Sequence, residues 1–248
     1  MSDYLIEKIL PAKKVHLLAG ISSAGKSRFI LPALVMYASG YPIMGCKSNP
    51  VPWCIVCKDR PLSDVQDTIT RIGFKYSDIN IIPAFGKYNK TLDMITREID
   101  KSGSQFVLWE GFDMMVKNPN SAGEVGEFLS VVTSHCEEGK TVLGTVGVAK
   151  LKPHEMYQNP RQLVAGTSIW ERATSTNLII QAIDPGNISD GRRLLYVSMK
   201  NDPSFAVGGK FDDNGILVFD TWAERDKGEK LAMAKAMERA ELWNNLYH

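Results

Sequence analysis

The stretch that decides the fold is VHLLAGISSAGKSR, residues 15–28. Its first five residues are an apolar run, which predicts a short buried strand at 15–19. The glycine loop GISSAGKS, residues 20–27, follows directly. Residues 28–40 are expected to form a helix with Pro32 in its first turn, where a missing N–H is tolerated. A strand, a glycine loop and a helix in this order predict a phosphate-binding loop.

The loop matches the pattern GxxxxGK(S/T) at all four fixed positions. Glycines let the backbone curl so that its N–H groups point at phosphate oxygens, and the following helix directs its positive end to the same place. Lys26 is expected to reach the β- and γ-phosphates, and the Ser27 hydroxyl to bind Mg²⁺. We therefore expect ATP and Mg²⁺ as cofactors. The predicted nucleotide-binding residues are Gly20, Ile21, Ser22, Ser23, Ala24, Gly25, Lys26, Ser27 and Arg28.

Strands and helices alternate along the first 150 residues. Apolar runs predict strands at 15–19, 52–57, 79–84, 106–109 and 141–149, and helical patterns occupy 28–40, 64–73, 91–102 and 124–138. This alternation predicts an α/β fold, in which helices cover both faces of a mostly parallel sheet. Four further strands, at 177–183, 193–199, 205–211 and 216–219, are joined by turn signals and are expected to extend the same sheet as antiparallel strands.

Composition and charge exclude several classes of protein. The 248 residues are 44% hydrophobic and 23% charged, which suits one globular α/β domain. The formal net charge is +1, so a nucleic-acid site would have to be a local patch. The N-terminus lacks the apolar core of a signal peptide, and no run approaches the roughly 18 apolar residues of a membrane span. We expect a cytoplasmic protein without a membrane partner.

Two of the four cysteines, Cys54 and Cys57, form a CxxC pair inside an apolar run. Residues three apart in a strand point to opposite faces of a sheet. No second pair follows at zinc-ligand spacing, so structural thiols are expected, with a metal or redox pair as the alternative.

Acidic residues follow two of the predicted strands. FVLWEGFD, residues 106–113, has four apolar residues, then Glu110, then Asp113. We expect a magnesium-holding acid at the end of a strand neighbouring the loop, and Glu110 takes this role, with Asp113 as second candidate and two solvated loop acids as the alternative. The segment CKDRP, residues 57–61, offers Asp59 at the same sheet edge, either to activate water for hydrolysis or only to begin a turn.

With these residues, the chain resembles the RecA-like ATPases. It is most similar to the branch that contains the plasmid RepA-type and DnaB-type hexameric helicases and small phage recombination ATPases, and the resemblance covers residues 14–219. GISSAGKS is the Walker A motif, and FVLWEGFD resembles Walker B. Three more segments resemble the family in matching order, namely CIVCKDRPLSDVQDTITRIG (54–73), TVLGTVGVAK (141–150) and LLYVSMKND (194–202).

The resemblance implies a homo-oligomer, a ring or filament with ATP at each subunit interface. Lys200 would then reach the γ-phosphate bound by the adjacent subunit and stabilise developing charge. Its alternative interpretation is an exposed lysine at a strand end. The family's catalytic glutamate falls near Lys58 or Asp59, and Asp202 stands where an arginine is usual. These departures imply slow hydrolysis, or a protein that uses ATP binding more than turnover.

The resemblance also implies a path for single-stranded DNA along the loops after the fourth and fifth strands, residues 111–123 and 150–166. The second loop carries the predicted DNA-binding residues Lys150, Lys152, Tyr157 and Arg161. Cations can follow phosphates, and an aromatic ring can stack on a base. The alternative is a mobile loop that covers the site without contacting nucleic acid.

Three functions remain open for a RecA-like ATPase domain spanning residues 1–222. The first is a helicase-like motor or filament protein that acts on single-stranded DNA in replication or recombination, in a bacterial cell or phage-infected host. The second is a phage single-strand annealing recombinase, and the third is a nucleotide-gated regulatory or assembly ATPase without DNA binding. Residues 223–248 predict an amphipathic helix, which packs on its own domain or on a neighbouring subunit.

Overall fold

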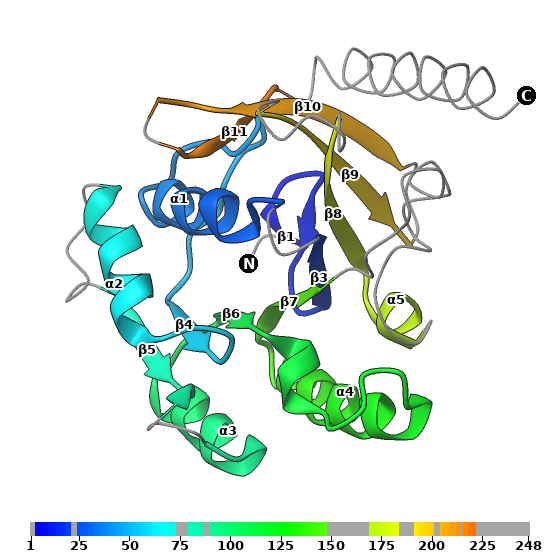
Figure 1. Cartoon of the computed structure of the whole chain (residues 1–248). Helices are drawn as coiled ribbons and strands as arrows, with labels where there is room; N and C mark the ends of the chain where they lie inside the picture. Colours follow the sequence, from blue (N-terminus) through cyan, green and yellow to red (C-terminus); the bar gives the residue numbers. More distant parts are fainter. Residues whose placement is uncertain are drawn as a thin grey trace, which may run out of the picture.

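The computed structural model describes residues 3–20, 24–72, 79–86, 90–147, 169–183, 191–200, 204–213 and 215–221. Within these ranges, one large sheet runs through the centre of the molecule (Figure 1). Its strands are β3 (Val15–Gly20), β4 (Trp53–Cys57), β5 (Asn80–Pro83), β6 (Phe106–Glu110), β7 (Thr141–Gly147), β8 (Thr176–Ala182), β9 (Arg192–Met199), β10 (Phe205–Phe211) and β11 (Leu217–Phe219).

The strand order is β11-β10-β9-β8-β3-β7-β6-β4-β5. From β8 through β5 all pairs are parallel, and β9, β10 and β11 are added antiparallel to β8 and to one another. The predicted mostly parallel sheet with an antiparallel extension is therefore confirmed. One detail differs from expectation, because β7 lies between β3 and β6, so Glu110 ends a strand that is not directly paired with the glycine loop's strand.

Helices cover both faces of this sheet, as predicted. The helices α1 (Lys26–Ala38) and α2 (Leu62–Arg71) pack on one face, and α3 (Leu92–Lys101), α4 (Ala122–Glu137) and the short α5 (Ile169–Ala173) pack on the other. Successive side chains along a strand point to opposite faces of the sheet, so one strand contributes to both hydrophobic cores. Leu108 lies in one core and Trp109 in the other. Cys57 and Cys54 likewise lie on opposite faces, and both are buried free thiols, so they cannot chelate one metal ion together.

The predicted start of the first helix needs correction, and a short hairpin was not predicted. The first helix begins at Lys26, two residues earlier than expected, because Gly25 takes a left-handed conformation (φ 99°) that ends the loop there. Pro32 therefore lies inside the helix, beyond its first turn. The strands β1 (Tyr4–Ile6) and β2 (Leu10–Pro11), which form a small separate hairpin, were not predicted, because two or three residues are too few to show a period.

The predicted helix at 223–248 lies outside the described residues, so it stays a prediction. The same holds for the division of the chain at residue 222. Among the helices that the structure does describe, none combines the length and the apolar character needed to cross a bilayer.

Candidate nucleotide-binding site

The glycine loop connects β3 to α1 at the carboxyl edge of the parallel strands, where α/β sheets bind their ligands. Gly20 ends β3, and a Cβ added there would lie 3.0 Å from the carbonyl oxygen of Ile180 on β8. Gly25 is required for two reasons, its positive φ and the ring of Phe211, whose Cζ would lie 2.7 Å from an added Cβ. Ile21, Ser22 and Ser23 lie outside the described residues, so their nucleotide contacts stay predictions.

Lys26, the first residue of α1, directs its ammonium group back across the loop. Its Nζ donates a hydrogen bond to the Gly20 carbonyl oxygen at 2.7 Å. Burial lowers the pKa of Lys26, and the carboxylates of Asp59, Asp113 and Glu110 oppose that shift, in this order of strength. The three acids predicted from the sequence therefore gather around the loop lysine, although they come from two different strand ends.

Glu110, the last residue of β6, is the most buried acid of the site, with 1% of its surface exposed. The Ser27 hydroxyl donates to its Oε1 at 3.5 Å, across 83 residues of sequence. This contact brings together two of the three predicted magnesium ligands, Ser27 and Glu110. Hydroxyl and carboxylate oxygens are the ligands that Mg²⁺ prefers, so these residues fit the predicted ion.

Arg60 is a member of the site that sequence reasoning missed. Its Nε donates to Glu110 Oε2 at 2.9 Å and its Nη2 donates to Glu110 Oε1 at 2.7 Å, which is the bidentate geometry of a guanidinium and a carboxylate. Burial raises the pKa of Glu110, and the Arg60 guanidinium opposes this shift. The only available signal was the position of Arg60 directly after Asp59, at the end of a strand that would lie beside β6.

Asp59 lies in the turn after β4, beside the turn that follows β6. An added Cβ on Gly111 would lie 3.0 Å from the Asp59 Cβ, and Gly111 has φ 81°, so a glycine there lets the two turns approach. Although the Asp59 side chain reaches solvent, the surrounding protein displaces enough water to raise its pKa. A carboxylate with a raised pKa is a stronger base, as an activator of water requires.

Asp113 has a different partner from Glu110. It belongs to the 3₁₀ helix η3 (Phe112–Met115), and its Oδ2 accepts a hydrogen bond from the Gly147 N–H at 3.0 Å. The preceding Phe112 is held over β7, because its ring occupies the space that a Cβ on Gly144 would need. Asp113 thus binds the end of β7, whereas Glu110 contacts Ser27. This geometry favours Glu110 as the metal ligand.

Side chains of the antiparallel strands β9 and β10 also contact the glycine loop. The ring of Phe211, on β10, packs against Gly25, and the guanidinium carbons of Arg28 and Arg193 lie 5.4 and 5.0 Å from its centroid. Arg193 also donates from Nε to the Ala24 carbonyl oxygen at 3.3 Å. The predicted loop residues Ala24 and Arg28 are therefore held by strands that follow them by more than 160 residues.

Lys200 does not join this site. It follows β9, which runs antiparallel to β8, so Met199 pairs with Thr176 at the amino edge of the sheet. The loop side of this strand pair is at Ile180, four residues and roughly 13 Å away along the strand. The Lys200 Nζ donates to the Arg172 carbonyl oxygen at 3.2 Å. Lys200 therefore cannot act on phosphates bound by its own loop.

The predicted DNA-binding residues Lys150, Lys152, Tyr157 and Arg161 lie outside the described residues. The structure does place the ends of β6 and β7, from which both predicted DNA loops leave, at the same carboxyl edge as the glycine loop.

Comparisons with known proteins bear on the fold. No protein-family model matches the sequence, and no curated protein does. Among solved structures, the chain is similar to a KaiC-like protein from the hyperthermophilic archaeon Pyrococcus horikoshii OT3, with a TM-score of 0.58 and 18% identity. The alignment covers 87% of this chain and 93% of that one. The chain thus has the predicted RecA-like α/β fold, and the comparison does not single out the RepA-type and DnaB-type branch.

Proposed function

We propose that this protein is a Mg²⁺-dependent ATPase of the RecA-like class. The observation that carries the proposal is the contact between the Ser27 hydroxyl and Glu110 Oε1 at 3.5 Å, beside the Lys26 ammonium group. A loop hydroxyl, a strand-end carboxylate and a lysine at the start of a helix are the groups that a nucleoside triphosphate and its metal ion need. A structural pair alone would not require the glycine loop or the surrounding acids.

Each residue has a distinct part in this mechanism. Lys26 leaves the Gly20 carbonyl and neutralises charge on the β- and γ-phosphates, while the N–H groups at the start of α1 bind phosphate oxygens. Ser27 and Glu110 would hold Mg²⁺, which would lower the repulsion between the phosphates and the incoming water. Asp59 would accept the proton of that water as the water oxygen bonds to the γ-phosphorus and the bond to the β–γ bridging oxygen breaks, which releases ADP and phosphate. The raised pKa of Asp59 suits this proton transfer.

The experiment that tests the proposal is the substitution Lys26→Ala. We expect ATP hydrolysis to fall below detection and ATP binding to weaken roughly tenfold or more, because the phosphates lose their point charge. Lys47→Ala, which changes an exposed lysine outside the site, is the matched control and should keep full activity. Phosphate release at the wild-type rate by a folded Lys26→Ala protein would rule out this site as the source of activity.

We further propose that the ATPase acts on single-stranded DNA as a motor or filament of identical subunits. Both predicted DNA loops begin at the nucleotide-binding edge of the sheet, which supports this proposal. Single-stranded DNA bound there and ATP could then influence each other. The placement of Lys200 at the opposite edge is compatible with a role toward a neighbouring subunit's nucleotide.

Binding and imaging test this second proposal together. Affinity for single strands should fall steeply as salt rises, and Lys152→Ala and Arg161→Ala should each reduce the salt slope by about one unit or less. Tyr157→Ala should cost roughly 1–3 kcal/mol with little change of slope. Electron microscopy with ATP and DNA should show rings or filaments. Absence of binding at low salt would leave a regulatory or assembly ATPase, and strand annealing without unwinding would indicate the recombinase.

A further inference from the structure

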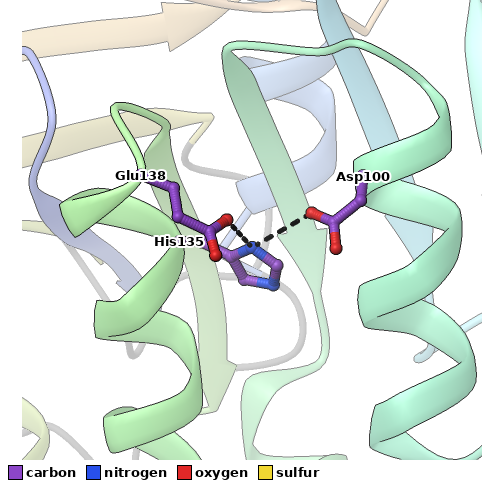
Figure 2. Close-up of side chains that lie close together, drawn as sticks. All are labelled: Asp100, His135 and Glu138. Carbon is purple, nitrogen blue, oxygen red and sulfur yellow. Dashed lines mark ion pairs between the residues drawn. The ribbon is translucent and has the colours of Figure 1, made fainter.

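A second polar cluster lies at the amino edge of the sheet, away from the glycine loop. It consists of Asp100 near the end of α3, His135 near the end of α4, and Glu138, which caps α4. Figure 2 shows that the three side chains converge between the two helices, with the carboxylates on either side of the imidazole ring. None of the three has a part in the nucleotide site.

The spacing of the ligand atoms fits a metal ion. His135 Nδ1 lies 3.6 Å from Asp100 Oδ1 and 3.7 Å from Glu138 Oε2, and all three atoms lie within 4.8 Å of one another. A tetrahedral ion with bonds of about 2.0–2.2 Å holds its ligand atoms roughly 3.3–3.6 Å apart. The two distances from His135 need to change by only a few tenths of an ångström, and the separation of the two carboxylate oxygens, at most 4.8 Å, by up to about 1 Å.

The imidazole of His135 is the second observation that points to a ligand. Its side chain is 2% exposed, and neither ring nitrogen has a hydrogen-bond partner in the part of the chain that the structure describes. Leaving buried polar atoms unpaired costs about 1–3 kcal/mol. Figure 2 shows Nδ1 directed at the two carboxylates.

Lys140 supplies the positive charge in the metal-free cluster. Its Nζ lies 3.0 Å from Asp100 Oδ1 and 2.9 Å from Glu138 Oε2, the same two oxygens that face the imidazole. A lysine side chain has a flexible four-carbon stem. Its ammonium group can therefore move into solvent when another cation takes its place.

We propose that Asp100, His135 and Glu138 form a binding site for a divalent transition-metal ion of the zinc class, which displaces the Lys140 ammonium group. One imidazole and two carboxylates suit Zn²⁺ or Co²⁺, whereas Mg²⁺ prefers oxygen ligands in octahedral geometry. The bound ion joins the end of α3 to the end of α4, and water completes its shell. The site is independent of the nucleotide site at the other edge.

The test is a titration of the full chain, first freed of metals with a chelator. Zn²⁺ should bind by calorimetry, and excess Mg²⁺ should not displace it. Co²⁺ should give the visible absorption of a four-coordinate ion, without the near-ultraviolet band of thiolate ligands. Asp100→Asn and Glu138→Gln remove one exposed ligand each, so both proteins should fold, and each should lose affinity roughly tenfold or more.

Two further variants make the test specific. Lys140→Met should strengthen Zn²⁺ binding, because the competing internal cation is gone, and a loss of affinity would overturn the displacement model. Glu137→Gln, an exposed neighbour outside the cluster, should leave affinity unchanged. Wild-type affinity in the Asp100→Asn/Glu138→Gln double variant, a thiolate band, or no Zn²⁺ binding at micromolar concentration would each overturn the site.

Discussion

Two clusters of cations and carboxylates lie at opposite edges of one sheet. The burial of their carboxylates distinguishes them, whereas the cations Arg60 and Lys140 are similarly exposed, at 17% and 15%. At the carboxyl edge, Arg60 forms a bidentate pair with Glu110, and their side chains are 17% and 1% exposed. At the amino edge, Lys140 contacts Asp100 and Glu138, which are 48% and 58% exposed. A buried charge depends on its partner, whereas an exposed one can return to water. The first cluster is therefore fixed in geometry, and the second can exchange its cation.

The largest expected effect comes from removing the cation of the buried cluster, Arg60. Arg60→Met should lower the free energy of unfolding by about 3–5 kcal/mol, because Glu110 would remain buried without a counter-charge. Lys140→Met, the matched change at the other edge, should cost less than about 1 kcal/mol. Urea denaturation measures both. The double variant Arg60→Met/Glu110→Gln should recover part of the loss, and equal costs for the two single variants would contradict the comparison.

The second effect concerns catalysis at the buried cluster. Glu110→Gln should lower Mg²⁺-dependent ATP turnover roughly a thousandfold, about 4 kcal/mol in the barrier, because the carboxylate facing Ser27 is lost. Asp113→Asn should do less, since Asp113 binds the Gly147 N–H. Steady-state phosphate release decides between them, with Glu127→Gln as the exposed control. The reverse ranking would transfer the metal-ligand role to Asp113.

The third effect is a loss of folding stability at acid pH, which we expect to originate at His16 near the amino edge of the sheet. His16 is fully buried, its Nε2 donates to the Pro11 carbonyl oxygen at 2.8 Å, and burial lowers its pKa to about 4. The folded state thus binds fewer protons than the unfolded state between these two pKa values, about 4 and 6.5. The stability that comes from keeping His16 neutral is therefore complete above pH 6.5 and is lost as the pH falls toward 4. The loss should reach about 3 kcal/mol.

Denaturation at several pH values should show this loss in the wild type but not in His16→Gln, which can keep the donor to Pro11. At the carboxyl edge the sign is opposite. Burial raises the pKa values of Glu110 and Asp59, so those groups favour the folded state as the pH falls. Identical pH profiles for the wild type and His16→Gln would show that His16 is not the sensitive group.

The smallest expected effect concerns Asp59, the exposed member of the carboxyl-edge cluster. Asp59→Asn should slow hydrolysis roughly a hundredfold, about 2.7 kcal/mol, and leave ATP binding near the wild-type value. Wild-type turnover should fall as the pH drops through the raised pKa of Asp59, because a protonated carboxyl cannot accept a proton from water. Single-turnover rates measured against pH test this, with Asp67→Asn as the control. Unchanged turnover would leave Asp59 as a turn residue.

The sequence by itself determined the features that depend on local patterns. The glycine loop, the apolar strand runs and the alternation of strands with helices are encoded in adjacent residues, because backbone conformation and burial follow from short-range periodicity. Glu110 could be placed at the carboxyl edge for the same reason, since the ends of parallel strands share one edge. The short hairpin of β1 and β2 escaped this reasoning because its strands are too short for a period to appear.

Only the tertiary structure decided which distant side chains meet. The insertion of β7 between β3 and β6, the pairing of Arg60 with Glu110 and the attachment of Asp113 to Gly147 depend on strand order and register, which local patterns do not encode. The antiparallel direction of β9 likewise sends Lys200 to the edge opposite the glycine loop. The cluster around His135 arises because two helices end side by side, a consequence of packing that neither helix sequence carries alone.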